Sequence, residues 1–257
     1  MSEIRITTIQ ADLKWEDIDG NLTMFDQYLS ELNGATDIVI LPEMFTTAFS
    51  MKSAEFCELM NGKTMSWLKE RAKQYDIVIT GSIIIKEDEN YYNRLIWMRA
   101  DGTFEQYDKH QLFKMAGEHK HYTAGNKKLI VAHKGFRFCP LVCYDLRFPV
   151  WARNVEDYDI LIYVANWPIA RRLHWRILLQ ARAIENQCYT IGVNRCGTDG
   201  LGYDYSGDTS IFSPYGEEVY HIADKAEMST IIITKSEIER IRKKIPYLED
   251  RDTFVIT

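Results

Sequence analysis

The chain has 257 residues, of which 46% are hydrophobic and 26% are charged, and its formal net charge is −6. These proportions are typical of a globular protein and exclude a disordered one, while the acidic balance argues against binding nucleic acid or anionic lipid through bulk charge. The apolar runs are far shorter than the ~20 residues that span a bilayer, and we expect no secretory signal at the N-terminus.

In the first half of the chain, helical and strand patterns alternate. Apolar residues at three- and four-residue steps predict amphipathic helices, and short continuous runs of β-branched residues predict strands covered on both faces. Asp101-Gly102 between two apolar runs predicts a β-hairpin. The elements predicted here are, in order, helix 22–32, strand 37–41, helix 63–75, strand 76–80, and the hairpin of 95–100 and 104–107.

The second half continues the alternation. The segment Ser236-Glu237-Ile238-Glu239 matches a capping box, with Glu three residues after Ser, and predicts the start of a late helix. Strands that alternate with helices, together with hairpins, predict an α/β layered sandwich with mixed sheets. The elements predicted here are strand 128–143, strand 159–163, a helix with an apolar stripe at Leu173, Ile177, Ala181 and Ile184, strand 189–194, a turn at 197–200, and a hairpin of 211–213 and 218–220.

The cysteine pattern indicates the redox environment of the chain, and the lack of linkers indicates its number of domains. Five cysteines, an odd number, are spread along the sequence and do not fit a disulfide framework, so we expect a reducing, cytoplasmic location. No low-complexity segment or repeat divides the sequence, which predicts a single domain over residues 1–257. The cysteines are Cys57, Cys139, Cys143, Cys188 and Cys196.

Three reactive side chains follow predicted strand ends, where functional residues gather in layered α/β proteins. They are Glu43, Lys109 and Cys143. A thiol with a pKa of ~8.5 is mostly protonated at neutral pH, so a nucleophilic cysteine needs a base, as Glu43 would be, or a cation, as Lys109 would be. Lys109 and the N–H of Tyr144 would also hold an oxyanion. Taken singly, each has a structural alternative: a structural carboxylate, a solvated lysine and a buried thiol.

The order of several motifs carries a family resemblance. Leu-Pro-Glu-Met at 41–44, Tyr-Asp-Lys at 107–109, Gly-Glu at 117–118 and Val-Cys-Tyr-Asp-Leu-Arg-Phe-Pro at 142–149 follow one another along the chain. This ordered set resembles the nitrilase superfamily of carbon–nitrogen hydrolases over nearly the whole length. Three more segments are similar to those of the ω-amidases, which hydrolyse the side-chain amide of 2-oxo dicarboxylic acid monoamides. These segments are 113–122, 164–168 and 180–187.

The resemblance implies a fold and a set of roles. The fold would be a four-layer αββα sandwich. Glu43 would be the general base, Lys109 the electrostatic stabiliser and Cys143 the nucleophile that forms a thioester, while Glu118 would position Lys109 or the substrate amide. Family members also pair sandwich to sandwich, so we expect a homodimer with the apolar C-terminal segment 245–257 at its interface. The chain departs from relatives at His110-Gln111-Leu112 and Val150, which concerns contacts around the triad.

The implied substrate is small and anionic, and no metal or organic cofactor is expected. His119 and His121 alone do not make a zinc site, and Cys139 and Cys143 lack a second close pair. A buried carboxylate of the substrate needs cationic or N–H donors. The candidate donors, left unranked, are Arg147, Arg171, Arg172, His119 and His121, and the candidate pocket residues are Tyr144, Asn166 and Trp167.

We therefore expect an ω-amidase that converts 2-oxoglutaramate or 2-oxosuccinamate to the 2-oxo acid and ammonia, with glutamine and asparagine much poorer substrates. One alternative is another enzyme of the superfamily: a different amidase, a nitrilase or an N-carbamoyl amidase. The other alternative is a non-catalytic interaction module that keeps the fold.

Overall fold

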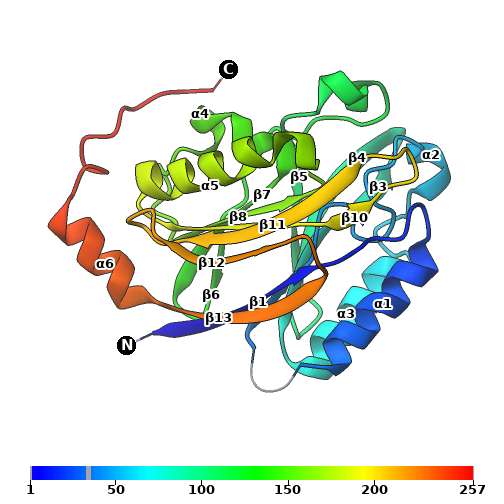
Figure 1. Cartoon of the computed structure of the whole chain (residues 1–257), viewed down its shortest axis with the longest axis horizontal. Coiled ribbons are helices and arrows are strands. Elements are labelled where there is room, and N and C mark those ends of the chain that lie inside the picture. The colour runs from blue at the N-terminus through cyan, green and yellow to red at the C-terminus, as the bar shows by residue number, and fades with distance from the viewer. Residues whose placement is uncertain (1, 33–35, 257) are drawn as a thin grey trace.

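A computed structural model describes residues 2–32 and 36–256. Two mixed sheets lie between layers of helices (Figure 1). Within the described residues, one sheet has six strands in the order β13-β1-β2-β3-β4-β5, and the other has seven, in the order β10-β11-β9-β8-β7-β6 with β12 paired to β11. This arrangement confirms the αββα sandwich.

The first sheet is parallel at its centre and antiparallel at both sides. β1, β2 and β3 run parallel, whereas β13, β4 and β5 join as antiparallel neighbours. The helices α1 and α3 cover its outer face (Figure 1). The elements are β1 (Glu3–Gln10), α1 (Ile18–Ser30), β2 (Ile38–Ile40), α2 (Ser53–Phe56), α3 (Lys63–Tyr75), β3 (Val78–Glu87), β4 (Asn90–Met98), β5 (Phe104–Asp108) and β13 (Glu227–Thr234).

The second sheet has the parallel strands β7, β8 and β9 at its centre. The helix α5 packs on its outer face through Trp175, Leu179 and Ala183 (Figure 1). Its strands are β6 (Val131–His133), β7 (Phe136–Val142), β8 (Ile160–Ala165), β9 (Tyr189–Asn194), β10 (Cys196–Thr198), β11 (Asp204–Phe212) and β12 (Glu218–Ala223). The helices that go with it are η1 (Lys114–Ala116), η2 (Glu118–Lys120), η3 (Cys143–Arg147), α4 (Pro149–Ala152), η4 (Ile169–Arg171), α5 (Arg172–Asn186) and α6 (Lys235–Lys244).

The short strand β2 is covered on both faces, which explains why its sequence is apolar at every position. Ile38 and Ile40 belong to the core between the two sheets, whereas Val39 belongs to the core between the first sheet and its helices. Successive side chains of a strand point to opposite faces, so a strand covered on both faces needs apolar residues at every position. In the inner core, Trp97 of β4 meets Phe138 of β7 with ring centroids 5.0 Å apart, which ties the two sheets together.

Two expectations about strands and turns were wrong in detail. The run 128–143 is a hairpin, β6 and β7, not one strand, because the chain turns at Lys134 and Gly135, whose φ angles are 45° and 81°. Glycine adopts such a left-handed conformation without steric cost. The predicted turn at 197–200 begins inside the strand β10, and the reversal into β11 is shifted by two residues, to 199–203.

Both helices predicted late in the chain form, as α5 and α6, but the stripe of α5 is exposed and the cap of α6 differs from the pattern. The apolar stripe of α5 faces away from the sheet: Leu173 is 65% exposed, Ile177 53% and Ile184 43%. Periodicity identifies an apolar face but not what covers it. The helix α6 begins one residue before Ser236, with Thr234 at its N-cap, and no capping box forms. Glu237 instead accepts a hydrogen bond from the Tyr189 hydroxyl. No helix in the described ranges is long and apolar enough to cross a membrane.

Candidate active site

Three strand ends bring the predicted reactive residues to one place between the sheets. Glu43 follows β2, Lys109 comes directly after β5, and Cys143 comes directly after β7. The φ angle of Cys143 is 44°, a left-handed conformation that non-glycine residues seldom adopt. The chain thus turns sharply from β7 into η3 at the thiol, and such strain is characteristic of functional sites.

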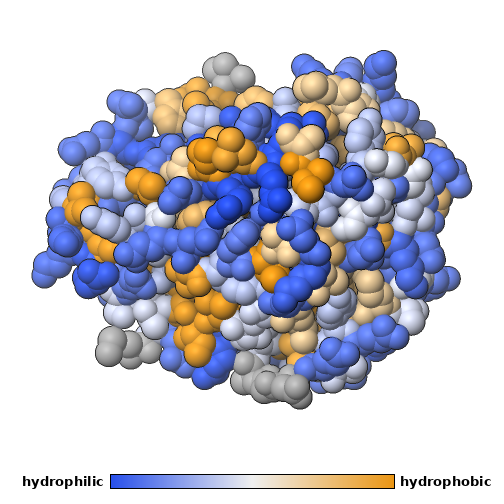
Figure 2. Space-filling model, viewed as in Figure 1, coloured by the Kyte–Doolittle hydropathy of each residue, from blue (hydrophilic) through white to orange (hydrophobic). Residues whose placement is uncertain are grey.

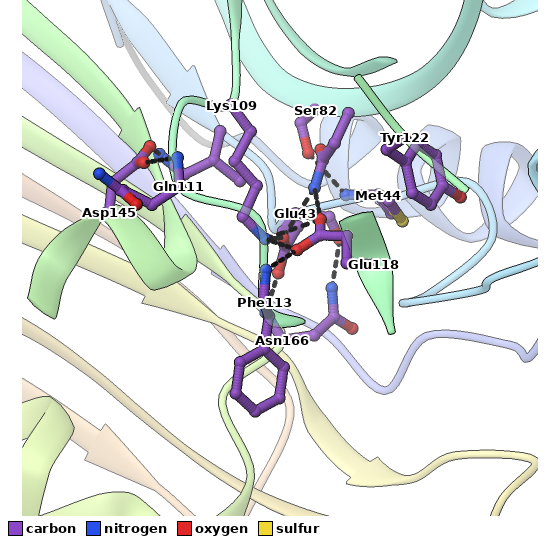
Figure 3. Close-up of polar contacts among 12 residues, drawn as sticks. Glu43, Met44, Ser82, Lys109, Gln111, Phe113, Glu118, Tyr122, Asp145 and Asn166 are labelled. Atoms are coloured by element: carbon purple, nitrogen blue, oxygen red, sulfur yellow. Dashed lines mark hydrogen bonds and ion pairs between the residues drawn. The ribbon is translucent and has the colours of Figure 1, made fainter. Parts of the chain in front are cut away.

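A buried cluster of charges occupies this place (Figure 3). The ammonium Nζ of Lys109 lies 2.9 Å from Oε1 of Glu43, and 2.9 and 3.0 Å from the two carboxylate oxygens of Glu118. All three side chains are at most 1% exposed. An ammonium has three N–H donors, and one of them can be shared between the two oxygens of Glu118, so one donor remains for a further acceptor.

Neutral donors hold both carboxylates in place. Nδ2 of Asn93, on β4, donates to Oε1 of Glu43 at 2.8 Å and lies 3.4 Å from Oε1 of Glu118. The backbone N–H of Asn166, just after β8, donates to Oε2 of Glu43 at 2.8 Å, and its side-chain amide donates to the Glu43 carbonyl at 2.6 Å. The backbone N–H of Phe113 donates to Glu118. Glu43 is therefore held from both sheets.

Asn93 was missed in the sequence. It lies in a strand whose next positions are mostly apolar, and it is only 1% exposed. A polar side chain inside a strand is a weak signal by itself, because its partners, Glu43 and Glu118, come from distant segments.

The electrostatics favour a neutral thiol in the resting site. Burial first, and then the charge of Glu43, raise the pKa of Cys143 well above its usual range, and Lys109 offsets this only in part. Burial lowers the pKa of Lys109, but Glu118 and Glu43 outweigh burial and raise it. Burial also raises the pKa of Glu118. Two carboxylates and one ammonium already sum to −1, so a thiolate would bring the buried charge to −2. Lys109 favours the thiolate, but burial and Glu43 together outweigh it.

A narrow cavity opens beside the thiol, with a volume of about 40 Å³. This is well below the ~300–1000 Å³ that is usual for ligand pockets, so the site has room only for a small group. The rings of Phe113 and Tyr144 lie 4.9 Å apart in its wall. All three predicted pocket residues are among those that line it: Phe49, Lys109, Phe113, Cys143, Tyr144, Arg147, Asn166, Trp167, Pro168 and Arg171.

Two of the five candidate anion donors reach this cavity. The guanidinium of Arg147 lies 4.5 Å from the Trp167 ring, and that of Arg171 lies 5.4 Å from the Phe113 ring. Arg147 also lies 3.3 Å from Nδ1 of His174, and neither arginine forms an ion pair with a described carboxylate. Arg172 instead pairs with Asp208 at 2.9 Å. The two histidines among the candidates, His119 and His121, do not line the cavity.

Within residues 2–32 and 36–256, no group of three or more histidine, cysteine, aspartate or glutamate side chains is placed to hold a metal ion. The arrangement of a thiol, a held carboxylate and a buried ammonium suits acyl transfer through a covalent intermediate.

Comparison with known proteins agrees with this chemistry. The chain is 43% identical over 256 residues to omega-amidase YafV of Escherichia coli (strain K12), covering 99% of each protein. It is 28% identical over 250 residues to 2-oxoglutaramate amidase of Bacillus subtilis (strain 168), covering 95% of this chain and 96% of that protein. The crystal structure of XC1258 from Xanthomonas campestris, a CN-hydrolase superfamily protein with an arsenic adduct in its active site, matches with a TM-score of 0.98 and 39% identity over 100% of both chains. The family model for carbon-nitrogen hydrolase matches residues 5–243. The chain therefore belongs to the carbon–nitrogen hydrolases of the nitrilase superfamily.

Proposed function

We propose that this chain is an ω-amidase, which hydrolyses the side-chain amide of a 2-oxo dicarboxylic acid monoamide to the 2-oxo acid and ammonia. One observation carries the proposal: a small cavity beside the thiol of Cys143 is lined by Lys109 of the buried ammonium–carboxylate cluster and by two arginines, Arg147 and Arg171, that form no ion pair with a described carboxylate. The names of the relatives in Escherichia coli and Bacillus subtilis support it, and family membership favours an enzyme over a non-catalytic module.

In the first half of the reaction, Sγ of Cys143 attacks the amide carbonyl carbon while Glu43 takes the thiol proton. The negative charge that develops on the carbonyl oxygen is held by Lys109 and by the backbone N–H of Tyr144. Such donors are most effective in a buried site, where they are oriented before the reaction begins. Glu43 then gives its proton to the leaving nitrogen, the C–N bond breaks, and ammonia leaves behind a thioester.

In the second half, Glu43 takes a proton from water, and the resulting oxygen nucleophile attacks the thioester carbon. The same two donors hold the oxyanion. The C–S bond breaks, Cys143 recovers its proton from Glu43, and the 2-oxo acid leaves. Glu118 would keep Lys109 protonated throughout, because it places a second carboxylate within 3.0 Å of the ammonium.

The arginines are proposed to bind the far carboxylate of the substrate. Replacing Arg147 or Arg171 with methionine should remove one charge-assisted hydrogen bond, a loss of about 2 kcal/mol or about 30-fold in KM, with a smaller effect on kcat. Steady-state kinetics with 2-oxoglutaramate would measure this. The matched control is Arg172→Met, which removes a neighbouring guanidinium that pairs with Asp208, and its KM should stay near that of the unmodified enzyme. Equal increases in all three variants would contradict the proposal.

The order of substrates tests the function itself. Glutamine carries an ammonium group where 2-oxoglutaramate carries an oxo group, and this cation would meet the same arginines. We expect its kcat/KM to be lower by roughly 100-fold, because like charges facing each other in a site cost several kcal/mol. Parallel assays should include asparagine, 2-oxosuccinamate, a simple nitrile and an N-carbamoyl amino acid. Turnover of glutamine, the nitrile or the carbamoyl compound as fast as 2-oxoglutaramate would contradict the assignment.

We also propose that the chain folds as a single domain and forms a homodimer. The exposed apolar stripe of α5 lies on a face where hydrophobic groups gather (Figures 1 and 2). The C-terminal residues Phe254, Val255 and Ile256 are exposed too, and the final segment extends away from α6 (Figure 1). Exposed apolar patches of this kind are typical of subunit interfaces. Of the predicted interface segment 245–257, Thr257 lies outside the described residues.

Light scattering at micromolar concentration should give twice the chain mass of 30.1 kDa. Ile177→Glu should shift the mass toward the monomer, because it places a charge at the centre of the exposed stripe of α5. Lys69→Glu, on α3 at the other side of the molecule, is the control and should leave the mass unchanged. A mass near 30.1 kDa for the unmodified chain would contradict the dimer.

The cysteines support a reducing location, which we propose to be the cytoplasm. All five are free, and four of them are buried. The mechanism above also requires Cys143 to remain a reduced thiol.

A further inference from the structure

A second buried carboxylate lies two residues after the nucleophile. Asp145, in η3, is 0% exposed and accepts three hydrogen bonds. The backbone N–H of Gln111 donates to Oδ1 at 2.8 Å (Figure 3). The Tyr107 hydroxyl donates to Oδ2 at 2.7 Å, and the backbone N–H of Val142 donates to Oδ2 at 3.0 Å. No described cation pairs with it, although burying a carboxylate without a counter-ion is costly.

The positions of the three donors show what this carboxylate connects. Val142 is the last residue of β7 and immediately precedes Cys143. Tyr107 and Gln111 lie two residues before and two residues after Lys109, where β5 ends. Since β5 belongs to the first sheet and β7 to the second, one carboxylate joins the backbone that carries the nucleophile to the backbone that carries the ammonium.

Both lone pairs of the Tyr107 hydroxyl accept hydrogen bonds, which leaves its proton for Asp145. The hydroxyl accepts hydrogen bonds from Nε1 of Trp151 at 2.9 Å and from the backbone N–H of His110 at 3.2 Å. A hydroxyl has two lone pairs and one proton, so these two donors direct the proton to Asp145. The His110 ring stacks on the Trp151 ring at 3.7 Å between centroids, which holds this arrangement together.

We propose that Asp145 is a positioning residue, whose carboxylate sets the placement of the Cys143 thiol relative to the Lys109 ammonium so that the oxyanion meets its donors. The inference rests on the proposed roles of Cys143 and Lys109 but not on the identity of the acyl chain. Burial raises the pKa of Asp145 to about 6, and the three donors that face it engage both of its oxygens as acceptors.

The variant Asp145→Asn tests whether this carboxylate joins the two backbone segments, because it changes the hydrogen bonding of the side chain and nearly keeps its volume. An asparagine has one acceptor oxygen, and its NH₂ group is a donor. Its oxygen can serve Val142 or Gln111 but not both, and the other backbone N–H then faces a second donor. We expect kcat to fall roughly 100-fold, as for a misplacement of about 1 Å, with KM changed by less than about threefold. The assay uses the best amide substrate of the unmodified enzyme, so failure of the ω-amidase assignment would not affect it.

Two further variants separate positioning from mere stability. Asp159, at the start of β8, is 1% exposed and accepts hydrogen bonds from the Arg137 N–H at 2.9 Å and from Lys235. Asp159→Asn should lower Tm. Its kcat, calculated per active site from the amount of Cys143 that a thiol reagent labels, should stay within about twofold of the unmodified value. Tyr107→Phe removes one donor and leaves the other two, so its kcat should fall roughly five- to tenfold, with KM unchanged.

Three results would overturn the proposal. The first is an unchanged kcat in Asp145→Asn. The second is a change in Asp145→Asn that affects KM alone, or a fall in its kcat no larger than that of Asp159→Asn when the two variants lose the same amount of Tm. The third applies if Asp145→Asn fails to fold: Tyr107→Phe then decides, and an unchanged kcat in that variant rejects the positioning role.

Discussion

Replacing Cys143 with alanine is expected to lower kcat for amide hydrolysis by about a thousandfold or more, because the covalent route is lost. Serine should not restore it, since a serine hydroxyl is a much weaker acid than a thiol and Glu43 would have to remove a proton held far more tightly. The measurement is steady-state ammonia release at saturating 2-oxoglutaramate, with circular dichroism to check the fold.

The matched control for this change is Cys139→Ala. Cys139 lies four residues earlier, in β7, and is also a buried free thiol. Burial raises its pKa, as it does for Cys143, but Cys139 does not line the cavity. Its removal should reduce stability through a small packing defect and leave kcat nearly unchanged. Near-normal turnover in Cys143→Ala, or an equal loss in Cys139→Ala, would reject Cys143 as the nucleophile.

Replacing Glu43 with glutamine is expected to lower kcat by about 10²–10⁴-fold, because an amide cannot act as a general base. The side chain keeps its volume, and its oxygen can still accept from Lys109. The free thiol should respond in the opposite direction. Glu43 raises the pKa of Cys143, so its removal lowers that pKa and increases the thiolate fraction at pH 7. Alkylation of Cys143 by iodoacetamide at pH 7 should therefore become faster while hydrolysis becomes slower.

This split between hydrolysis and alkylation makes the Glu43 prediction specific. A merely misfolded site would lose both activities together, and slower alkylation in Glu43→Gln would contradict the charge argument. Glu58→Gln is the control: Glu58 is half-buried and accepts a hydrogen bond from the Thr64 N–H at 2.7 Å. It lies outside the cavity wall. Both hydrolysis and alkylation should remain near normal in that variant.

Local patterns predicted many of the elements well. The helix expected at 63–75 is α3 (Lys63–Tyr75), and the strand expected at 189–194 is β9 (Tyr189–Asn194). The turn at Asp101-Gly102 joins β4 to β5 as expected. These features depend on propensities and turn chemistry within a few residues, which a sequence contains in full.

The errors arose where a distant segment decides the outcome. The stripe of α5 has helical spacing, but the sheet is covered by Trp175 and Leu179 on another side of the helix. The predicted capping box pairs Ser236 with Glu239, but the helix begins after Thr234, and Glu237 in its first turn accepts a hydrogen bond from the Tyr189 hydroxyl of β9. In both cases, tertiary contacts outweigh a local preference worth about 1 kcal/mol or less.

The sequence by itself determined which residues could carry the chemistry: Glu43, Lys109 and Cys143 at three strand ends, and Glu118 from the family motif. Only the tertiary structure decided how they work together. It placed Lys109 between two carboxylates, it buried the Cys143 thiol beside Glu43, which raises the pKa of that thiol, and it selected Arg147 and Arg171 over Arg172 for the cavity. The reason is physical: charge balance and hydrogen bonding depend on distances of about 3 Å between groups on different sheets, and no local pattern encodes such distances.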